Sequence, residues 1–111
     1  MGDVIERLLD DSALRFAAAM AVIETVADGS LKHYAITGKP EFLGIGYAGY
    51  AGVVYVFQRA LKKEKLFRVN NYWNALTSVS DTLVGVAMGE SITQTQILGV
   101  ALIVTGILLV W

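Results

Sequence analysis

AAAMAVIETVADGSLK, residues 17–32, is the stretch that decides how the rest of the chain is interpreted. Residues 17–23 are apolar, and Glu24, Asp28 and Lys32 then follow at intervals of four residues. Residues four apart lie on one face of a helix, so these three side chains form a single charged stripe. Inside a bilayer such charges would be costly and would mark a functional position. We therefore expect the other helices to pack around this stripe.

The composition is more apolar than that of an ordinary globular domain. Of the 111 residues, 55% are hydrophobic and 17% are charged, whereas globular domains average about 25% charged residues. The charges occur in patches, and the segments between them are long enough to cross a hydrocarbon core of roughly 30 Å. We predict an all-α fold, in which residues 1–111 form one integral membrane four-helix bundle. The net charge of −1 gives no electrostatic reason to expect nucleic-acid binding.

The predicted membrane spans lie at about residues 13–33, 42–61, 69–88 and 93–111. Residues 1–12 precede them as a short amphipathic segment, which we expect to lie at the membrane interface. Each span is followed or preceded by residues typical of turns and helix ends.

Two local signals mark where these helices end and begin. Thr37-Gly-Lys-Pro40 predicts a turn, because Gly and Pro together interrupt a helix. Thr93 followed by Gln96 predicts a capping box, with Ser91 and Gln94 as a shifted alternative. The loop at residues 59–68 contains five Lys and Arg residues and, with the N-terminal segment, places seven basic residues on one side against two on the other. This bias predicts that both termini face the cytoplasm.

Small residues recur at helical spacing in two of the predicted helices. Gly44, Ala48 and Gly52 lie four apart, and Gly99 and Gly106 lie seven apart. Small residues at such spacing allow helix backbones to approach closely. We predict helix–helix contacts at these glycines.

A second polar stripe runs along the third predicted helix and ends at Asp81. Tyr50, Tyr72 and Trp73 could present aromatic faces to a cationic ligand. The predicted binding residues for a proton or a substrate are Glu24, Asp28, Tyr50, Tyr72, Trp73 and Asp81.

The charged stripe predicts linked protonation. Burial raises the pKa of a carboxyl group, so we expect Glu24 to titrate closer to neutral pH. Asp28 lies one turn further on, so the two should titrate as a coupled pair. Asp28 four residues before Lys32 is also the favourable orientation for an ion pair. The alternative is that these residues and Asp81 form a polar network that only fixes helix packing.

These features together resemble the small multidrug resistance family, within the drug/metabolite transporter superfamily. Glu24 followed by Lys32 matches the spacing between the family's membrane glutamate and the lysine that closes its first span. Tyr50 and Trp73 fall where the family has its pocket tyrosine and tryptophan. Gly99 and Gly106 match the glycine spacing of its dimerising fourth span. The resemblance implies a four-helix membrane fold, proton/cation exchange at Glu24 and a dimer.

The expected function is a proton-coupled membrane transporter of small organic cations or related polar metabolites, acting as a homo- or heterodimer in membrane lipid. Two alternatives remain: a non-transporting membrane assembly or accessory protein, and one half of a heteromeric carrier. The sequence has no nucleophile–base pair, no metal-spaced cluster and no phosphate-binding loop. We therefore expect neither an enzyme nor a bound metal or cofactor.

Overall fold

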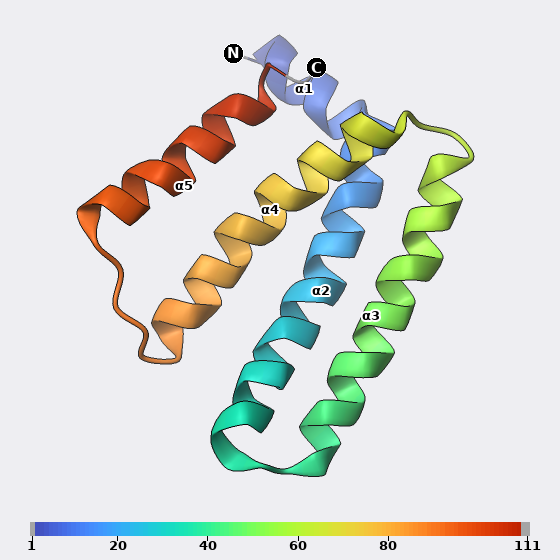
Figure 1. Cartoon of the computed structure of the whole chain (residues 1–111). Coiled ribbons are helices and arrows are strands. Elements are labelled where there is room, and N and C mark those ends of the chain that lie inside the picture. Colours follow the sequence, from blue (N-terminus) through green and yellow to red (C-terminus); the bar gives the residue numbers. More distant parts are fainter. Residues whose placement is uncertain (1, 110–111) are drawn as a thin grey trace.

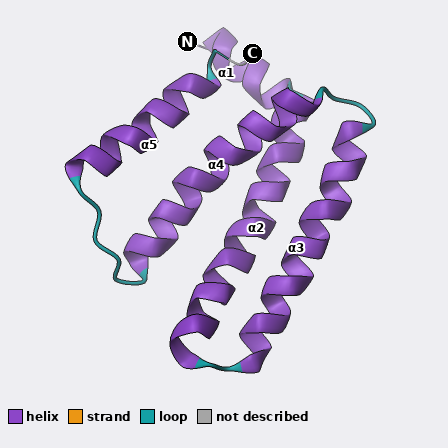
Figure 2. Cartoon of the chain, viewed as in Figure 1, coloured by secondary structure: helices purple, strands orange, loops and turns teal. Residues whose placement is uncertain are grey.

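The computed structural model describes residues 2–109, and the described chain is helical with no strand. Figures 1 and 2 show its five helices, which are α1 (Gly2–Asp10), α2 (Ser12–Thr37), α3 (Pro40–Leu61), α4 (Leu66–Ala87) and α5 (Gln94–Ile107). The all-α prediction is confirmed, and the helices correspond to the predicted segments. The last predicted segment extends to residues 110–111, which lie outside the described residues.

The four long helices lie side by side in the order α3, α2, α4, α5, as Figure 1 shows. Helix α2 is central and packs on both α3 and α4, whereas α5 contacts α4. The molecule measures 45 × 36 × 21 Å, so its smallest dimension is about two helix diameters. Because the array is open, each long helix keeps part of its surface uncovered.

The seam between α2 and α3 depends on glycines. A Cβ atom added to Gly49 would lie 2.7 Å from the Cβ of Ala27, and one added to Gly46 would lie 2.4 Å from Cδ2 of Leu31. Both distances are shorter than van der Waals contact. The absence of side chains at these two positions therefore allows the two backbones to approach closely.

The glycines of α3 that approach α2 most closely are therefore Gly46 and Gly49, whereas the predicted contact glycines were Gly44 and Gly52. A Cβ added to Gly52 would meet Ile23 Cγ2 at an ordinary 3.5 Å, and one added to Gly44 would meet nothing within 4 Å. A helix rotates by about 100° per residue, so Gly44 points away from the face on which Gly46 and Gly49 lie. The principle of small-residue packing applies, but mostly at other glycines.

The buried core lies where α2, α3 and α4 meet near the start of α2. Its residues are Ala13, Ala17, Met20, Val53, Ala60, Val69 and Tyr72. Most of these side chains are small, so burial here depends on close approach of the helices rather than on large apolar groups. Tyr72 is the largest fully buried side chain.

A polar contact ties α4 to the start of α2. Asp11 caps α2, because its Oδ1 accepts a hydrogen bond of 2.9 Å from the backbone N–H of Ala13. Its other oxygen pairs with the guanidinium of Arg68, whose NH1 also lies 3.8 Å from Glu64. The phenol of Tyr72 donates to the same Asp11 oxygen over 3.4 Å. This contact was not predicted from the sequence.

Both local predictions of helix ends are confirmed. Gly38 ends α2 with φ 72°, a left-handed conformation that favours glycine, and its N–H donates to Tyr34 O over 2.7 Å. Pro40 then opens α3. At α5 the backbone N–H of Gln96 donates to the Thr93 hydroxyl, and the Gln96 side chain accepts from the Thr93 N–H.

The membrane predictions are wrong. Among residues 2–109, no helix combines the length and the apolar composition that crossing a bilayer requires. Helix α5 is the most apolar but has 14 residues, where a span needs about 20. Helix α2 carries Glu24, Asp28 and Lys32 in its second half, and the apolar residues of α3 are diluted by glycines and tyrosines. The predicted spans, membrane localisation and cytoplasmic termini therefore do not stand.

Candidate functional site

The acidic stripe of α2 meets side chains from both neighbouring helices. Glu24 contacts Trp73 of α4, Asp28 contacts Tyr50 of α3, and Asp81 of α4 lies near Asp28. We call these five residues the acidic–aromatic cluster. The structure brings together five of the six predicted binding residues, because α2 lies between the two helices that supply the others.

Glu24 is held by an aromatic donor rather than by a cation. The indole N–H of Trp73 donates to Glu24 Oε2, and the Trp73 ring packs against Phe57 with centroids 5.2 Å apart. Burial raises the pKa of Glu24, the hydrogen bond from Trp73 opposes this rise, and the charge of Asp28 adds to it. The direction agrees with the sequence prediction.

Asp28 raises the pKa of two neighbouring groups in the cluster, Tyr50 and Asp81. The phenol of Tyr50 donates to Asp28 Oδ1, and this hydrogen bond is the main cause that raises the pKa of Tyr50. Burial, followed by the neighbouring Asp28 and the more distant Glu24, raises the pKa of Asp81 to about 7. The Asp81 Oδ1 atom is buried and has no hydrogen-bond partner in the described chain. Asp81 is therefore largely protonated at slightly acidic pH.

Lys32 lies beside the acidic–aromatic cluster and lines the same small cavity as Asp28 and Asp81. Its Nζ lies 3.1 Å from Glu90 Oε2, in the turn after α4. Asp28, Asp81, Lys32 and Glu90 all line one small cavity of about 130 Å³. Lys32 therefore pairs with Glu90, and a direct pair between Asp28 and Lys32 stays a prediction.

Glu90 reaches Lys32 because Gly85 leaves room for it. A Cβ atom on Gly85 would lie 2.2 Å from Glu90 Oε1. Glu90 folds back over the end of α4, and its backbone N–H donates to Gly85 O over 3.0 Å. The sequence shows Gly89-Glu90 only as a turn, and its ion pair depends on how α4 lies beside α2.

Tyr72 does not belong to the cluster. Its side chain is fully buried and its hydroxyl lies beside Asp11 and Arg68 at the opposite end of α4. Tyr72 and Trp73 are adjacent in sequence, so their side chains point about 100° apart on the helix. Tyr72 therefore lies apart from the other predicted binding residues, and its binding role stays a prediction.

The predicted contact glycines of α5 are not in close contact with another helix of the described chain. A Cβ atom added to Gly99 or Gly106 would find no atom within 4 Å. The described part of α5 contains no buried residue. Contact of these glycines with a second copy stays a prediction.

No metal site accompanies the cluster. Among residues 2–109, no group of three or more His, Cys, Asp or Glu side chains is arranged to hold a metal ion. What the cluster offers instead is three carboxyl groups, one of which carries a proton near neutral pH, together with one phenol and one indole.

Comparison with known proteins leaves the chain without an assigned family: no family model, curated protein or solved structure matches it significantly. The resemblance to the small multidrug resistance family is therefore wrong. Its matches were single residues at common spacings, which unrelated apolar helices also contain. With no membrane-spanning helix among the described residues, the predicted membrane transporter and its membrane-bound alternatives are also withdrawn.

Proposed function

We propose that the chain binds a small organic ammonium ion at the acidic–aromatic cluster, and that binding displaces a proton. The observation that carries this proposal is the pair of facing carboxyl groups, Asp28 and Asp81, at the edge of a small cavity. Two neighbouring carboxylates repel each other, so one keeps its proton. A cation between them removes that repulsion and takes the place of the proton.

The surrounding groups suit an ammonium ion. Asp81 Oδ1 has an unused acceptor position, and Glu24 adds a third negative charge nearby. Tyr50 is 38% exposed, so its ring is accessible to a cation, and aromatic faces attract cations. Lys32 is paired with Glu90, which reduces its repulsion of an arriving cation. The cavity of about 130 Å³ suits an ion of a few heavy atoms.

The test is calorimetric titration with methylammonium at pH 6 and pH 8. Because Asp81 titrates at about 7, affinity should be about tenfold higher at pH 8, and binding at pH 6 should release a proton. Asp81→Asn should abolish the proton release. Asp10→Asn removes an exposed carboxylate of α1 and is the matched control. Binding that is equally strong at both pH values, or unchanged in Asp81→Asn, would leave the cluster with a packing role only.

Self-association is a second candidate, supported by α5. This helix contains no charged residue and no buried residue, and Leu98 and Leu102 are each more than half exposed. Large exposed apolar surfaces are typical of interaction sites. A Cβ atom added to Gly99 would meet no atom of the described chain within 4 Å, so a loss of dimer in Gly99→Leu, measured by light scattering, would report on a partner copy. Unchanged mass in this variant would exclude this face.

A further inference from the structure

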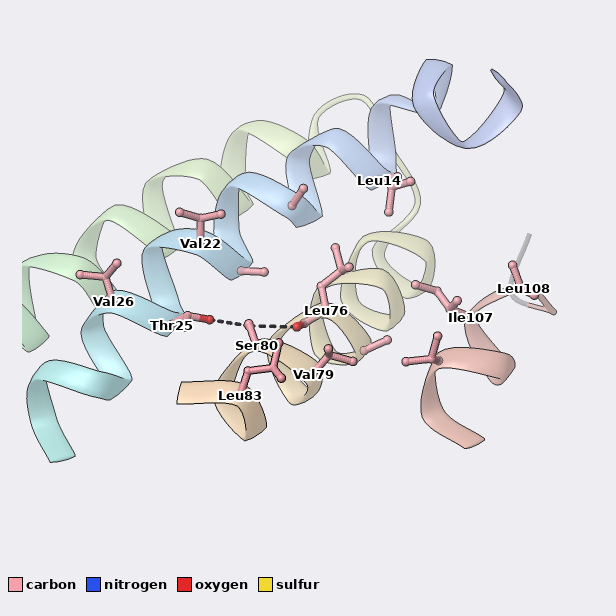
Figure 3. Close-up of a pocket in the computed structure, with 14 residues that line it drawn as sticks. Leu14, Val22, Thr25, Val26, Leu76, Val79, Ser80, Leu83, Ile107 and Leu108 are labelled. Atoms are coloured by element: carbon pink, nitrogen blue, oxygen red, sulfur yellow. Dashed lines mark hydrogen bonds between the residues drawn. The ribbon is translucent and has the colours of Figure 1, made fainter. Parts of the chain in front are cut away.

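A long apolar groove follows the seam between α2 and α4, and α5 borders one end of it (Figure 3). Its volume is about 680 Å³, within the range of roughly 300–1,000 Å³ typical of ligand sites. The groove begins at Leu14, Ile107 and Leu108 and extends to Val26 and Leu83. None of the carboxylates of the acidic–aromatic cluster lines it, so it is a separate site.

Between Leu14 and Val26, the groove has no polar side chain that is free to form a hydrogen bond with a ligand. Its only polar side chains are Thr25 and Ser80, whose hydroxyl oxygens lie 2.6 Å apart. Ser80 also donates to Leu76 O over 3.0 Å, as the dashed lines of Figure 3 show. Both hydroxyl groups are therefore satisfied. A polar ligand group placed here would lose its hydrogen bonds to water without replacement, so the occupant must be apolar over this stretch.

The dimensions of the groove suit an extended hydrocarbon chain. Leu14 and Val26 are twelve residues apart on α2, which corresponds to about 18 Å. An extended chain advances about 1.2 Å per bond, so the groove accommodates about 15 bonds.

The groove continues into a more polar end. A second cavity of about 330 Å³ shares Thr25 and Val26 with the first and is also lined by Ser30 and His33. The His33 ring contacts Phe42 edge-on, with centroids 4.3 Å apart. No hydrogen bond to the Ser30 hydroxyl or the His33 imidazole is formed within the described residues. Both groups are one to two helical turns beyond Val26, about 6–11 Å away along the axis.

We propose that this groove binds a long-chain fatty acid of about 20 carbons, whose alkyl chain lies between Leu14 and Val26 and continues to a carboxyl group at Ser30 and His33. Binding would cover apolar side chains that are now in water, since Val22, Val26 and Leu83 are each more than half exposed. The proposal does not depend on the acidic–aromatic cluster or on its function.

The first experiment measures affinity against chain length. Saturated fatty acids of 12, 16, 20 and 24 carbons are titrated calorimetrically into the full chain, at concentrations at which each acid is monomeric. Affinity should rise by up to about fourfold for each added methylene, and the gain should stop beyond about 20 to 22 carbons, when the groove is full. Affinity independent of chain length would overturn the proposal.

Two adjacent alanines provide a matched pair of variants. Ala18 lines the groove, whereas Ala19 is also exposed but lies outside it. Ala18→Phe should fill the groove and lower the affinity for the 20-carbon acid at least tenfold, while Ala19→Phe leaves it unchanged. Circular dichroism checks that both variants remain helical. Equal affinities in the two variants would show that the acid binds elsewhere.

The head-group contact and the rival occupant are tested separately. His33→Leu should lower the affinity for the 20-carbon acid about tenfold, because a hydrogen bond to a carboxylate is lost. Light scattering during the titration reports the mass of the protein. If no acid binds, and a dimeric wild type becomes monomeric in Ala18→Phe, the groove belongs to a second copy and the fatty-acid proposal is wrong.

Discussion

Helices α3 and α5 lie at opposite edges of the same array, but they are packed very differently. Helix α3 approaches α2 closely enough to bury Gly46, Val53 and Ala60. Helix α5 is more apolar, lacks charged residues and buries none of its described residues. The difference lies in the facing surfaces: Gly49 meets Ala27 directly, while the glycines of α5 face open space. Burial in this chain follows surface shape more than apolar content.

The largest expected effect tests this comparison directly. Gly49→Leu should lower the free energy of unfolding by about 3 kcal/mol, because the new side chain must separate α2 from α3. Gly99→Leu, measured at the same low protein concentration, should change it by less than about 0.5 kcal/mol. Urea denaturation measures both. Equal losses would mean that α5 is packed as closely as α3.

The second-largest effect concerns the ion pair between Arg68 and Asp11, which joins α4 to the start of α2. The described part of α5 contains no charged residue that could form such a pair. Asp11 has an 8% exposed side chain and Arg68 a 23% exposed one. Arg68→Met should destabilise the chain by about 2 kcal/mol, since a mostly buried carboxylate loses its partner. Arg15→Met, which removes an exposed guanidinium from the same end of α2, serves as the control. Similar values for the two variants would show that Asp11 is solvated without Arg68.

A smaller effect should depend on pH. The folded-state pKa of Asp81, about 7, is above its usual 3.8, so the folded state holds more protons than the unfolded state between these values. Stability should therefore fall as pH rises from about 4 to 7. Asp81→Asn should stabilise the chain by about 1 kcal/mol at pH 8, a value reduced for solvent screening, and by much less at pH 4. An Asp81→Asn effect that is constant with pH would contradict the raised pKa.

The smallest expected effect is on the outer surface of α5. Leu98 is 59% exposed, so Leu98→Lys should change the free energy of unfolding by no more than about 0.5 kcal/mol. Thermal unfolding at two protein concentrations measures it. If Leu98→Lys lowers the stability strongly only at the higher protein concentration, a second copy of the chain covers α5.

Local interactions along the chain made much of the helical architecture predictable. Gly38 and Pro40 end one helix and start the next, and Thr93 and Gln96 cap α5, because these effects involve residues within one turn of each other. The placement of Glu24 and Asp28 on one face also follows from helical spacing alone. The high apolar content, however, suggested a membrane protein, because composition does not show whether apolar residues form one continuous span.

Only the tertiary structure decided which groups meet across helices. Trp73 reaches Glu24 while its neighbour Tyr72 reaches Asp11, and Glu90 forms an ion pair with Lys32. Such contacts depend on the rotation and axial shift of each helix relative to the next. A shift of one residue turns a side chain by about 100° around the helix axis. The spacing of residues within one helix therefore does not show which residues of a neighbouring helix they contact. The same reason explains why Gly49 packs against Ala27 and Gly44 does not.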